Sequence, residues 1–415
     1  MNFTLPQMTS TLKTTFATLR YPNYRAYLIG FMISVCGLWA HLTAAGYLVY
    51  DLTGSATYLG YFGFAQGFAF ILLALLSGVI ADRVPRRKML IFTQFGMMIE
   101  ATVLTVLTFS GAVQAWQVIG LTFILGIVRA LDSPNRLAFI SELVEPEDLS
   151  NAIPLHSTFL NSAAIIGPII AGFLYTLVGP GWVFLFDALT YVAFLIPLIR
   201  MRTTHEQDHL QKHHSAAFHE MKDGIRYAFS NNIIRLLLLS LLLYNIFGLS
   251  VRNLTPAWAS NVLLGGAQTN SWLLAGVGVG AVIAALVIAS MSYKRVRGKL
   301  RLFGGFAYAT SLITLFLFRW QSISILMFVL MGTASMMIAN NTLGIIQTCV
   351  SEEVRGRVSG IFTMMFMGGS TIGSLLVGYL ADNIGETHTV LICGLVLLTL
   401  TLYLMFNKRE LVSLG

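Results

Sequence analysis

The stretch Gly78–Leu90 reads GVIADRVPRRKML and lies between two long apolar segments of the chain. It holds one carboxylate, Asp82, in a loop too short to form more than a tight turn. Four cations share that loop: Arg83, Arg86, Arg87 and Lys88. Apolar segments of about 20 residues on both sides are typical of membrane-spanning helices. Because loops rich in Lys and Arg stay in the cytoplasm, this stretch predicts a multi-pass membrane protein with this loop inside the cell.

The composition excludes an ordinary soluble protein. Hydrophobic residues make up 56% of the 415-residue chain and charged residues 11%, whereas soluble domains average about 25% charged residues. A net charge of +8 would suggest nucleic-acid binding in a soluble protein. Membrane topology explains the cations better, so we expect no nucleic-acid partner. The cysteines are too few and too scattered for a disulfide framework or a metal site: Cys36, Cys349 and Cys393.

Twelve apolar segments are long enough to cross a bilayer as helices. The fold is therefore expected to be an all-α membrane protein with short loops between its spans. No secretory signal precedes the first segment, which is expected to direct insertion as well. The expected spans are 26–50, 57–81, 89–110, 116–137, 153–177, 181–200, 233–258, 270–292, 302–319, 322–346, 358–381 and 388–406.

Lys and Arg gather on one side of the expected membrane. They cluster in the N-terminal tail, after the second span, around the central loop and at 294–301. The loops on the other side contain neither residue: 51–57, 111–115, 179–181, 263–269 and 382–389. This asymmetry predicts that both termini lie in the cytoplasm.

The chain repeats itself at an offset of 206 residues, about half its length. The identical pairs are Gly126 and Gly332, Asn135 and Asn341, Val144 and Val350, Glu147 and Glu353, Gly167 and Gly373, Gly172 and Gly378, Leu174 and Leu380, and Gly179 and Gly385. Chance matching of glycine-rich helices is the alternative. A true repeat predicts two pseudo-symmetric six-helix bundles, 1–200 and 232–415. The linker 201–231 between them is expected to be cytoplasmic, with an amphipathic helix over 220–229 lying on membrane lipid.

The opening stretch resembles the signature between the second and third helices of the major facilitator superfamily, G-x-L-A-D-R-x-G-R-K-x-x-L. Ile80 stands for the Leu, Pro85 for the second Gly and Arg87 for the Lys. In that superfamily the Asp grips the start of the eleventh helix in the outward-facing state. The resemblance therefore implies a gating loop that pairs Asp82 with the helix start near 358–360, and Arg83 or Arg86 with Glu352 or Glu353. Its residues are Gly78, Asp82, Arg83, Arg86 and Arg87. Alternatively, the cations only fix topology.

Two other stretches are similar to this signature. Residues 294–301, KRVRGKLR, keep a glycine and the cations but have no Asp, so we expect only a topological role for them. Residues 378–385, GYLADNIG, contain an Asp. The repeat aligns this segment with the fifth span, and the topology places it on the opposite side of the membrane. We therefore expect no gating role for Asp382.

The fifth span contains AAIIGPIIAG at 163–172. It resembles the G-x-x-x-G-P-x-x-G-G signature of drug–proton antiporters and keeps Gly167, Pro168 and Gly172, with Ala163 and Ala171 in place of two glycines. Small residues allow close helix contact across the interface between the bundles, and a proline bends the helix. Packing alone is the alternative. The resemblance implies export rather than import.

Three longer stretches resemble the branch that contains enterobactin exporters and macrolide-efflux proteins. They are 129–153, the segment from 165 to 192, and EMKDGIRYAFSNNIIRLLL at 220–238. The resemblance implies a monomeric exporter in the bacterial inner membrane, not an enzyme, which moves a drug-like or siderophore-like amphiphile by proton antiport with alternating access. A lipid or lysolipid transporter is the alternative within transport. A non-transporting receptor or scaffold is the alternative of another class.

Few ionisable residues lie inside the spans, and each is costly there unless paired or hydrated. Glu100 lies near the middle of the third span and Asp187 in the sixth; burial favours the neutral form of a carboxyl, which suits a group that binds and releases a proton. We expect these two to couple transport to protons, with Arg129 as a charge partner. Structural hydrogen bonding is the alternative for Glu100. The alternative for Arg129 is a local pair with Asp132, three residues away.

The resemblance implies that the first, fourth, seventh and tenth spans line the substrate cavity. The lining candidates are Trp39, His41, Asn245, Arg252, Asn253, Met336, Asn340 and Asn341. An apolar cavity with amides and one cation suits an amphiphilic or weakly anionic substrate.

The central loop contains His205, His209 and His213 at four-residue spacing, which on a helix could bind a transition metal. A solvated linker is the preferred interpretation, so no metal site is expected. The sequence also lacks a nucleotide-binding loop of the form G-x-x-x-x-G-K-[ST]. We therefore expect no cofactor, and transport that depends on an ion gradient or is passive.

Overall fold

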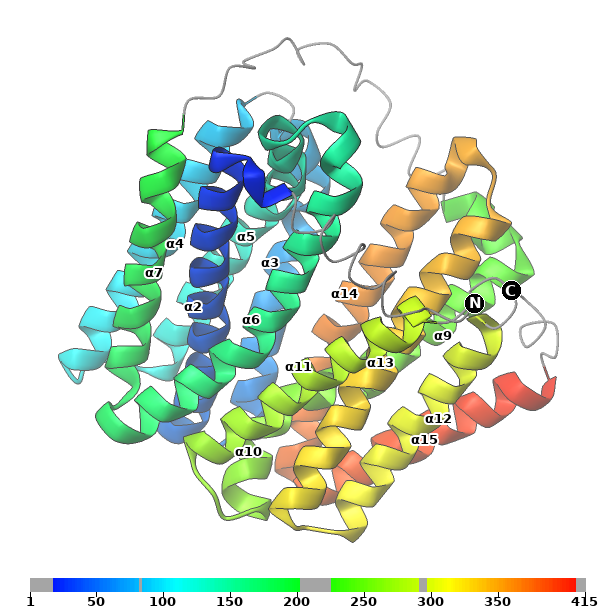
Figure 1. The fold of residues 1–415 in the computed structure, drawn as a ribbon. Helices are drawn as coiled ribbons and strands as arrows, with labels where there is room; N and C mark the ends of the chain where they lie inside the picture. Colours follow the sequence, from blue (N-terminus) through cyan, green and yellow to red (C-terminus); the bar gives the residue numbers. More distant parts are fainter. Residues whose placement is uncertain (1–17, 82–83, 202–224, 291–296, 408–415) are drawn as a thin grey trace.

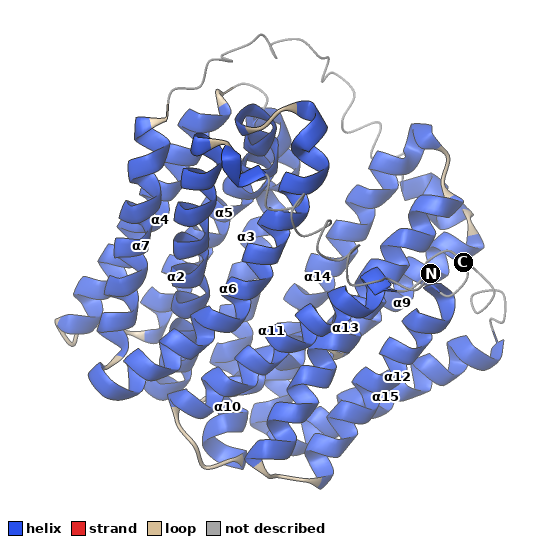
Figure 2. Ribbon diagram, in the orientation of Figure 1, coloured by secondary structure: helices blue, strands red, loops and turns tan. Residues whose placement is uncertain are grey.

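The computed structural model describes residues 18–81, 84–201, 225–290 and 297–407, and these ranges contain helices and turns but no strand (Figure 2). Twelve helices among them are long and apolar enough to cross a membrane. The expectation of an all-α membrane protein with twelve spans is confirmed.

The first six spans form the N-terminal bundle. Because α2 packs on α6 and α7, α3 on α5, and α4 on α5 and α7, their apolar faces meet inside this bundle (Figure 1). The helices are α2 (Pro22–Thr53), α3 (Ala56–Ala81), α4 (Arg86–Phe109), α5 (Ala115–Leu143), α6 (Leu149–Val178) and α7 (Pro180–Arg200).

The other six spans form the C-terminal bundle in the same way, with α11 on α13, α12 on α13 and α15, and α9 on α14. The helices are α9 (Asn232–Phe247), α11 (Ala267–Ser290), α12 (Arg297–Leu317), α13 (Gln321–Cys349), α14 (Glu352–Ile384) and α15 (Glu386–Asn407). Residues 225–230, part of the expected amphipathic segment, are also helical. The rest of the linker, 202–224, lies outside the described residues, and so do its histidines.

The seventh span is not the continuous helix that the sequence predicted over 233–258. After α9 the chain forms the 3₁₀ turn η3 (Leu249–Leu254), one turn of α-helix, α10 (Thr255–Ala257), and the π-helical segment η4 (Trp258–Val262). Pro256, at the start of α10, has no N–H to continue the regular hydrogen-bond ladder. Discontinuous helices are typical of binding sites in transporters.

Matching glycines show that the 206-residue offset relates the two bundles in space. A Cβ on Gly167 of α6 would lie 2.8 Å from the backbone oxygen of Cys36 on α2, and a Cβ on Gly373 of α14 would lie 2.7 Å from Cα of Ile246 on α9. The fifth and eleventh spans therefore approach the first and seventh spans in the same manner. This equivalence supports two bundles built on one plan.

The bundles meet mainly through two helix pairs, α3 with α14 and α6 with α11, with smaller contacts of α2 with α10 and α11 and of α3 with η3. In Figure 1 the bundles lie together near α10 and diverge toward the end where α7 finishes. We call the end where α7 finishes the basic end, since Arg86, Arg200 and Arg297 mark helix ends there. We call the end near α10 the opposite end. At the opposite end the tight turns contain glycines with positive φ: Gly54, Gly179 and Gly385.

A buried polar network holds the core of the N-terminal bundle between α4 and α5. Asp132 accepts hydrogen bonds from Thr93 Oγ1 at 2.7 Å and Gln94 Nε2 at 2.9 Å, and it forms an ion pair with Arg136. The Arg136 guanidinium also lies 5.0 Å from the ring centroid of Phe31. Asp132 thus pairs with Arg136 and not with Arg129, so the suggested local pair of Arg129 and Asp132 is wrong. A spacing of four residues places the actual partners on one helix face.

Replacing Asp132 by Ala should leave the Arg136 cation buried without its partner and lower the free energy of unfolding by about 3–5 kcal/mol. Thermal unfolding of the detergent-solubilised protein measures this effect. Arg20→Ala is the control, because it removes a surface pair with Asp148, 2.8 Å apart and with an Arg20 side chain 62% exposed, that contributes about 0–1 kcal/mol. Equal losses in the two variants would contradict a special role for the buried pair.

Gly280→Ala should destabilise the C-terminal bundle by about 1–3 kcal/mol. The added Cβ would lie 2.7 Å from the backbone nitrogen of Thr333, so α11 and α13 would have to separate. Gly120→Ala on α5 is the matched control, since no heavy atom lies within 4 Å of its Cβ position. Thermal unfolding would contradict this account if both variants melted at the same temperature.

Candidate functional site

Three ionisable side chains from three helices meet inside the N-terminal bundle. His41 on α2 lies between Asp187 on α7 and Glu100 on α4. Its Nδ1 is 3.0 Å from Asp187 Oδ2, and its Nε2 is 3.6 Å from Glu100 Oε1. The three side chains are 0%, 0% and 2% exposed, in that order. We call this group the His41 triad.

Close helix packing positions the His41 triad. A Cβ on Gly37, one turn before His41, would lie 2.6 Å from Asp187 Oδ1, so only glycine lets α2 approach α7 at this level. The Phe184 ring meets the imidazole edge-on, with centroids 5.1 Å apart. These contacts fix the imidazole plane and direct one ring nitrogen toward each carboxyl group.

The arrangement is suited to holding an exchangeable proton. A neutral imidazole can donate from only one nitrogen, whereas an imidazolium can donate to both carboxylates. Two carboxylates and one imidazolium carry a net charge of −1, and low-dielectric surroundings make such a charge costly. One further proton, or a nearby cation, makes the group neutral.

Arg129 is a cation in the same bundle as the triad. It is half-buried on α5, which packs against α4, the helix of Glu100. It forms no ion pair with a described residue, whereas Asp132 is occupied by Arg136. With Arg129, the fully ionised triad is neutral, and loss of one proton gives −1.

The structure brings together residues that the sequence placed in different roles. Glu100 and Asp187 were expected to act separately in coupling, and His41 was expected to line the substrate cavity. The His41 side chain is fully buried between the two carboxyl groups, so its assignment to the cavity is wrong for this conformation. His41 is 59 residues from Glu100 and 146 residues from Asp187 along the chain, and such separations give no signal that these residues pair.

The other cavity candidates differ in exposure. Asn340 is exposed and Trp39, Arg252 and Met336 are half-buried, but Asn341 is fully buried and does not line a cavity. Asn253, in η3, packs its amide against Gly63 of α3, across the interface between the bundles. Arg252 forms no ion pair with a described residue, and its Nε is buried without a hydrogen-bond partner there.

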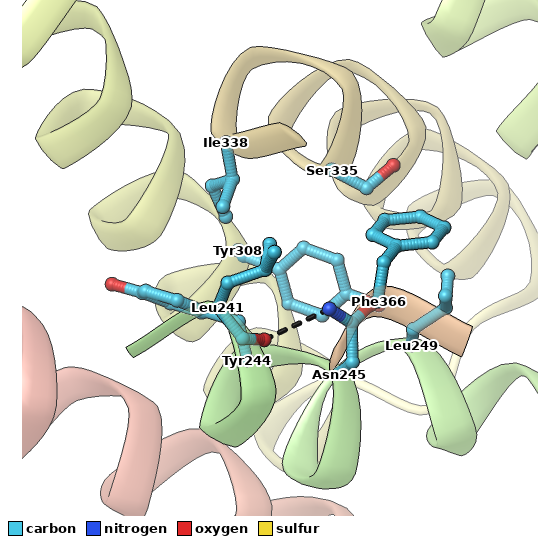
Figure 3. A pocket seen from close by; sticks show the side chains of 8 residues that line it. All are labelled: Leu241, Tyr244, Asn245, Leu249, Tyr308, Ser335, Ile338 and Phe366. Atoms are coloured by element: carbon cyan, nitrogen blue, oxygen red, sulfur yellow. Dashed lines mark hydrogen bonds between the residues drawn. The ribbon is translucent and has the colours of Figure 1, made fainter. Parts of the chain in front are cut away.

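Asn245 lines a small pocket in the wall of the C-terminal bundle, with room for about one water molecule in this conformation (Figure 3). Its Nδ2 donates to Leu241 O on its own helix at 2.8 Å. Tyr308, Ser335 and Phe366 reach the same pocket from α12, α13 and α14. The Tyr308 hydroxyl is buried and has no partner among the described residues. Sequence reasoning missed Tyr308 and Phe366 because it assigned the cavity to other helices.

The glycines of the fifth-span motif serve two different contacts. Gly167 packs within its own bundle against α2. Gly172 packs across the interface, and its Cβ would lie 2.5 Å from Cβ of Ser271 on α11. Pro168 is buried inside α6 between them. Only the second glycine therefore makes the inter-bundle contact expected for the motif.

The opening loop makes its described contacts inside the N-terminal bundle. Arg86 donates to Ala138 O at 2.9 Å and lies 3.4 Å from Glu142, and Arg87 donates to the carbonyls of Leu198 and Ile199, both at 2.7 Å. The expected pairing of Arg86 with Glu352 is absent: Glu352 lies 3.8 Å from Arg355 instead. Cations at the ends of α5 and α7 suit the negative end of the helix dipole.

The remaining residues of that loop are placed only in part. The backbone of Gly78 belongs to α3. Asp82 and Arg83 lie outside the described residues, as do the side chain of Glu353 and the loop 291–296.

Asp382 makes contacts that the sequence analysis did not expect. Its carboxylate, at the end of α14, accepts hydrogen bonds from Ser55 Oγ at 2.5 Å, from Ala56 N at 2.7 Å and from Thr57 N at 2.9 Å. These donors form the start of α3, in the other bundle. Asp382 therefore contacts the other bundle, although nothing in the sequence suggested a gating role for it.

Within the described part of the chain, no group of three or more His, Cys, Asp or Glu side chains could hold a metal ion. The histidines of the central loop lie outside that part. The His41 triad is thus the main cluster of titratable side chains that remains to be explained by function.

Comparison with known proteins places this architecture in a family. The model of the transmembrane secretion effector family matches residues 13–412. The staphyloferrin A transporter of Staphylococcus aureus is 25% identical over 379 residues, covering 90% of this chain and 94% of that protein. The enterobactin exporter EntS of Escherichia coli is 24% identical over 394 residues, covering 94% and 93%.

Solved structures share the fold at low sequence identity. A point mutant of the nucleoside transporter NupG has a TM-score of 0.73 at 13% identity, covering 92% of this chain and 99% of that one. A D-xylose–proton symporter has a TM-score of 0.71 at 15% identity, covering 93% and 99%. From the family match over nearly the whole length and the shared architecture, the chain belongs to the transmembrane secretion effector family of major facilitator transporters.

Proposed function

We propose that this protein exports an amphiphilic, siderophore-like or drug-like small molecule in exchange for protons, and that the His41 triad carries the proton. The observation behind the coupling is the placement of one imidazole between two carboxyl groups in a fully buried site. Buried ionisable groups in a membrane protein are costly and mark proton or ion pathways. The names of the two relatives, a staphyloferrin A transporter and an enterobactin exporter, support a siderophore-like cargo.

Alternating access links the triad to transport in this proposal. Helices α2, α4 and α7, which carry the triad, also pack the N-terminal bundle as one body. A change of one unit charge among them alters the preferred packing of α2 against α6, and α6 contacts α11 of the other bundle. Residues 1–200 and 232–415 are the two moving units, and the linker 201–231 keeps them together.

The conformation is consistent with access from the basic end. The contacts between the bundles lie mainly in α3 with α14 and in α6 with α11, and they include the opposite end at Ser55 and Asp382. The topology deduced from Lys and Arg makes the basic end cytoplasmic, with both termini inside a bacterial inner membrane. Asp82 and the gating-loop cations Arg83, Arg86 and Arg87 would close that end in the other half of the cycle.

Substrate recognition is assigned to the C-terminal bundle and the broken seventh span. Asn245, Tyr308 and Phe366 offer an amide, a hydroxyl without a partner among the described residues, and an aromatic face. Arg252 is the one cation of η3, and Trp39, Asn340 and the half-buried Met336 extend the lining. These groups suit an amphiphile with polar or weakly anionic substituents. The protein would act as a monomer, without a cofactor and without catalysis.

Glu100→Gln and Asp187→Asn should each lower export driven by a pH gradient by about tenfold or more, because neither amide can bind and release the proton. The measurement is flux of the candidate substrate into inverted vesicles or proteoliposomes with an imposed gradient. Substrate exchange without a gradient should persist, which shows that the variants fold and bind. Asp51→Asn, an exposed carboxyl at the end of α2, is the control.

Three outcomes would overturn the proposal in different ways. Intact gradient-driven flux in both triad variants would remove the coupling assignment while leaving export in place. No flux of siderophores, drugs or lysolipids by the wild type, with or without a gradient, would favour a receptor or scaffold. Flux of lysolipid alone would identify a lipid transporter.

Tyr308→Phe should raise the substrate Kd by about five- to tenfold, which corresponds to about 1–1.5 kcal/mol for one lost hydrogen bond. Thermal stability should not fall, because the Tyr308 hydroxyl has no partner among the described residues. Tyr24→Phe in the N-terminal bundle is the matched control: its buried hydroxyl donates to Ala152 O at 2.8 Å, so its loss should lower stability and leave affinity unchanged. Binding to purified protein measures both effects, and unaltered affinity in Tyr308→Phe would remove the pocket from the substrate path.

A further inference from the structure

The end of α14 is hydrogen-bonded to the start of α3 through a single carboxylate, that of Asp382. Both oxygens of Asp382 take part: Oδ1 accepts from Ala56 N at 2.7 Å, and Oδ2 accepts from Thr57 N at 2.9 Å and Ser55 Oγ at 2.5 Å. The first N–H groups of a helix have no partners inside the helix. Asp382 satisfies two of these donors from the other bundle.

The electrostatics of this contact favour its formation. The start of a helix carries a partial positive charge, so a carboxylate placed there is stabilised, and hydrogen bonds to a charged acceptor are stronger than neutral ones. Asp382 is nevertheless exposed, and water can replace the three donors when the helices part. The contact therefore combines specificity with reversibility, as a part of a moving interface requires.

The helices on either side of the contact are shaped for close approach. A Cβ on Gly60 of α3 would lie 2.7 Å from Ser374 O, and a Cβ on Gly378 of α14 would lie 2.6 Å from Ala56 O. Ser374 and Thr371 are buried in this seam. Asp382 thus lies at the end of a tightly packed contact between α3 and α14.

This contact has no counterpart at the repeat-related position. The residue 206 positions before Asp382 is Thr176 on α6, which cannot present a charge to the start of α11. Of the two main helix pairs that join the bundles, only α3 with α14 therefore carries this carboxylate.

We propose that Asp382 is a positioning residue that latches the opposite end of the transporter shut, and that its three hydrogen bonds must break before that end opens. In this conformation the α3–α14 pair would then be latched at the opposite end by Asp382 on the start of α3. This proposal does not depend on the identity of the substrate or of the coupling ion.

The test compares Asp382→Ala with the neighbouring control Asn383→Ala, whose amide bonds only Tyr379 O on its own helix among the described residues. The reporter is a cysteine at Ser374, labelled with a polar maleimide in a background where Cys36, Cys349 and Cys393 are replaced. Loss of the latch should speed labelling about tenfold, because the seam opens more often. A cysteine at Asn340, exposed in this conformation, should be labelled more slowly in the same variant.

The paired reporters separate a latch from local damage. Fraying of the end of α14 would speed labelling at Ser374 without slowing it at Asn340, and that outcome would overturn the proposal. Unchanged labelling at both sites would overturn it as well. Ser55→Ala should give a smaller effect of the same sign, and adding it to Asp382→Ala should change nothing further, because the hydroxyl has then already lost its acceptor.

Discussion

The cost of placing charge in an apolar interior is the constraint on which the rest of this structure depends. The ion pair between Asp132 Oδ2 and Arg136 offsets that cost, and Thr93 and Gln94 donate hydrogen bonds to Asp132 Oδ1. In the His41 triad the carboxyl oxygens of Glu100 and Asp187 have no hydrogen-bond partner among the described residues, and the imidazole lies 3.6 Å and 3.0 Å from them. This lack of hydrogen bonds distinguishes the triad from the fully bonded Asp132–Arg136 pair.

Small residues determine where helices pack closely, both within each bundle and between the two bundles. Gly37 lets α2, the helix of His41, pack closely on α7. Gly167 lets the fifth span pack on the first, and Gly373 lets the eleventh pack on the seventh. Gly172 contacts α11 of the other bundle. Without a hydrophobic driving force between helices in lipid, such close backbone contact provides much of the packing energy. The glycine pattern therefore determines which surfaces are fixed inside a bundle and which form the seam between bundles.

Much of the fold could be predicted from the sequence because spans, charge asymmetry and repeat are local or periodic signals. Twelve apolar segments, the basic loop at 78–90 and the 206-residue offset were sufficient for the architecture. The site was only partly predictable. Glu100 and Asp187 could be singled out as costly charges, but their meeting at His41 depends on the rotation of three helices, which periodicity does not specify. Because helix rotation cannot be predicted from periodicity, the sequence also did not predict the Asp132–Arg136 pair, the pocket at Tyr308 or the contacts of Asp382. The break after Gly248 was missed because apolar residues recur up to Val262 and the segment was interpreted as one helix despite Pro256.

The break in the seventh span gives the two bundles different mechanical properties. Its counterpart in the first bundle, α2, is an uninterrupted rod of 32 residues, about 48 Å long at 1.5 Å per residue. Such a rod transmits a displacement at the imidazole to both of its ends. The seventh span instead takes three kinds of winding between Leu249 and Val262, 3₁₀, α and π, so it does not form one continuous rod. The His41 triad therefore sits on a continuous helix, whereas the pocket lined by Asn245 and Leu249 lies where the seventh span is interrupted.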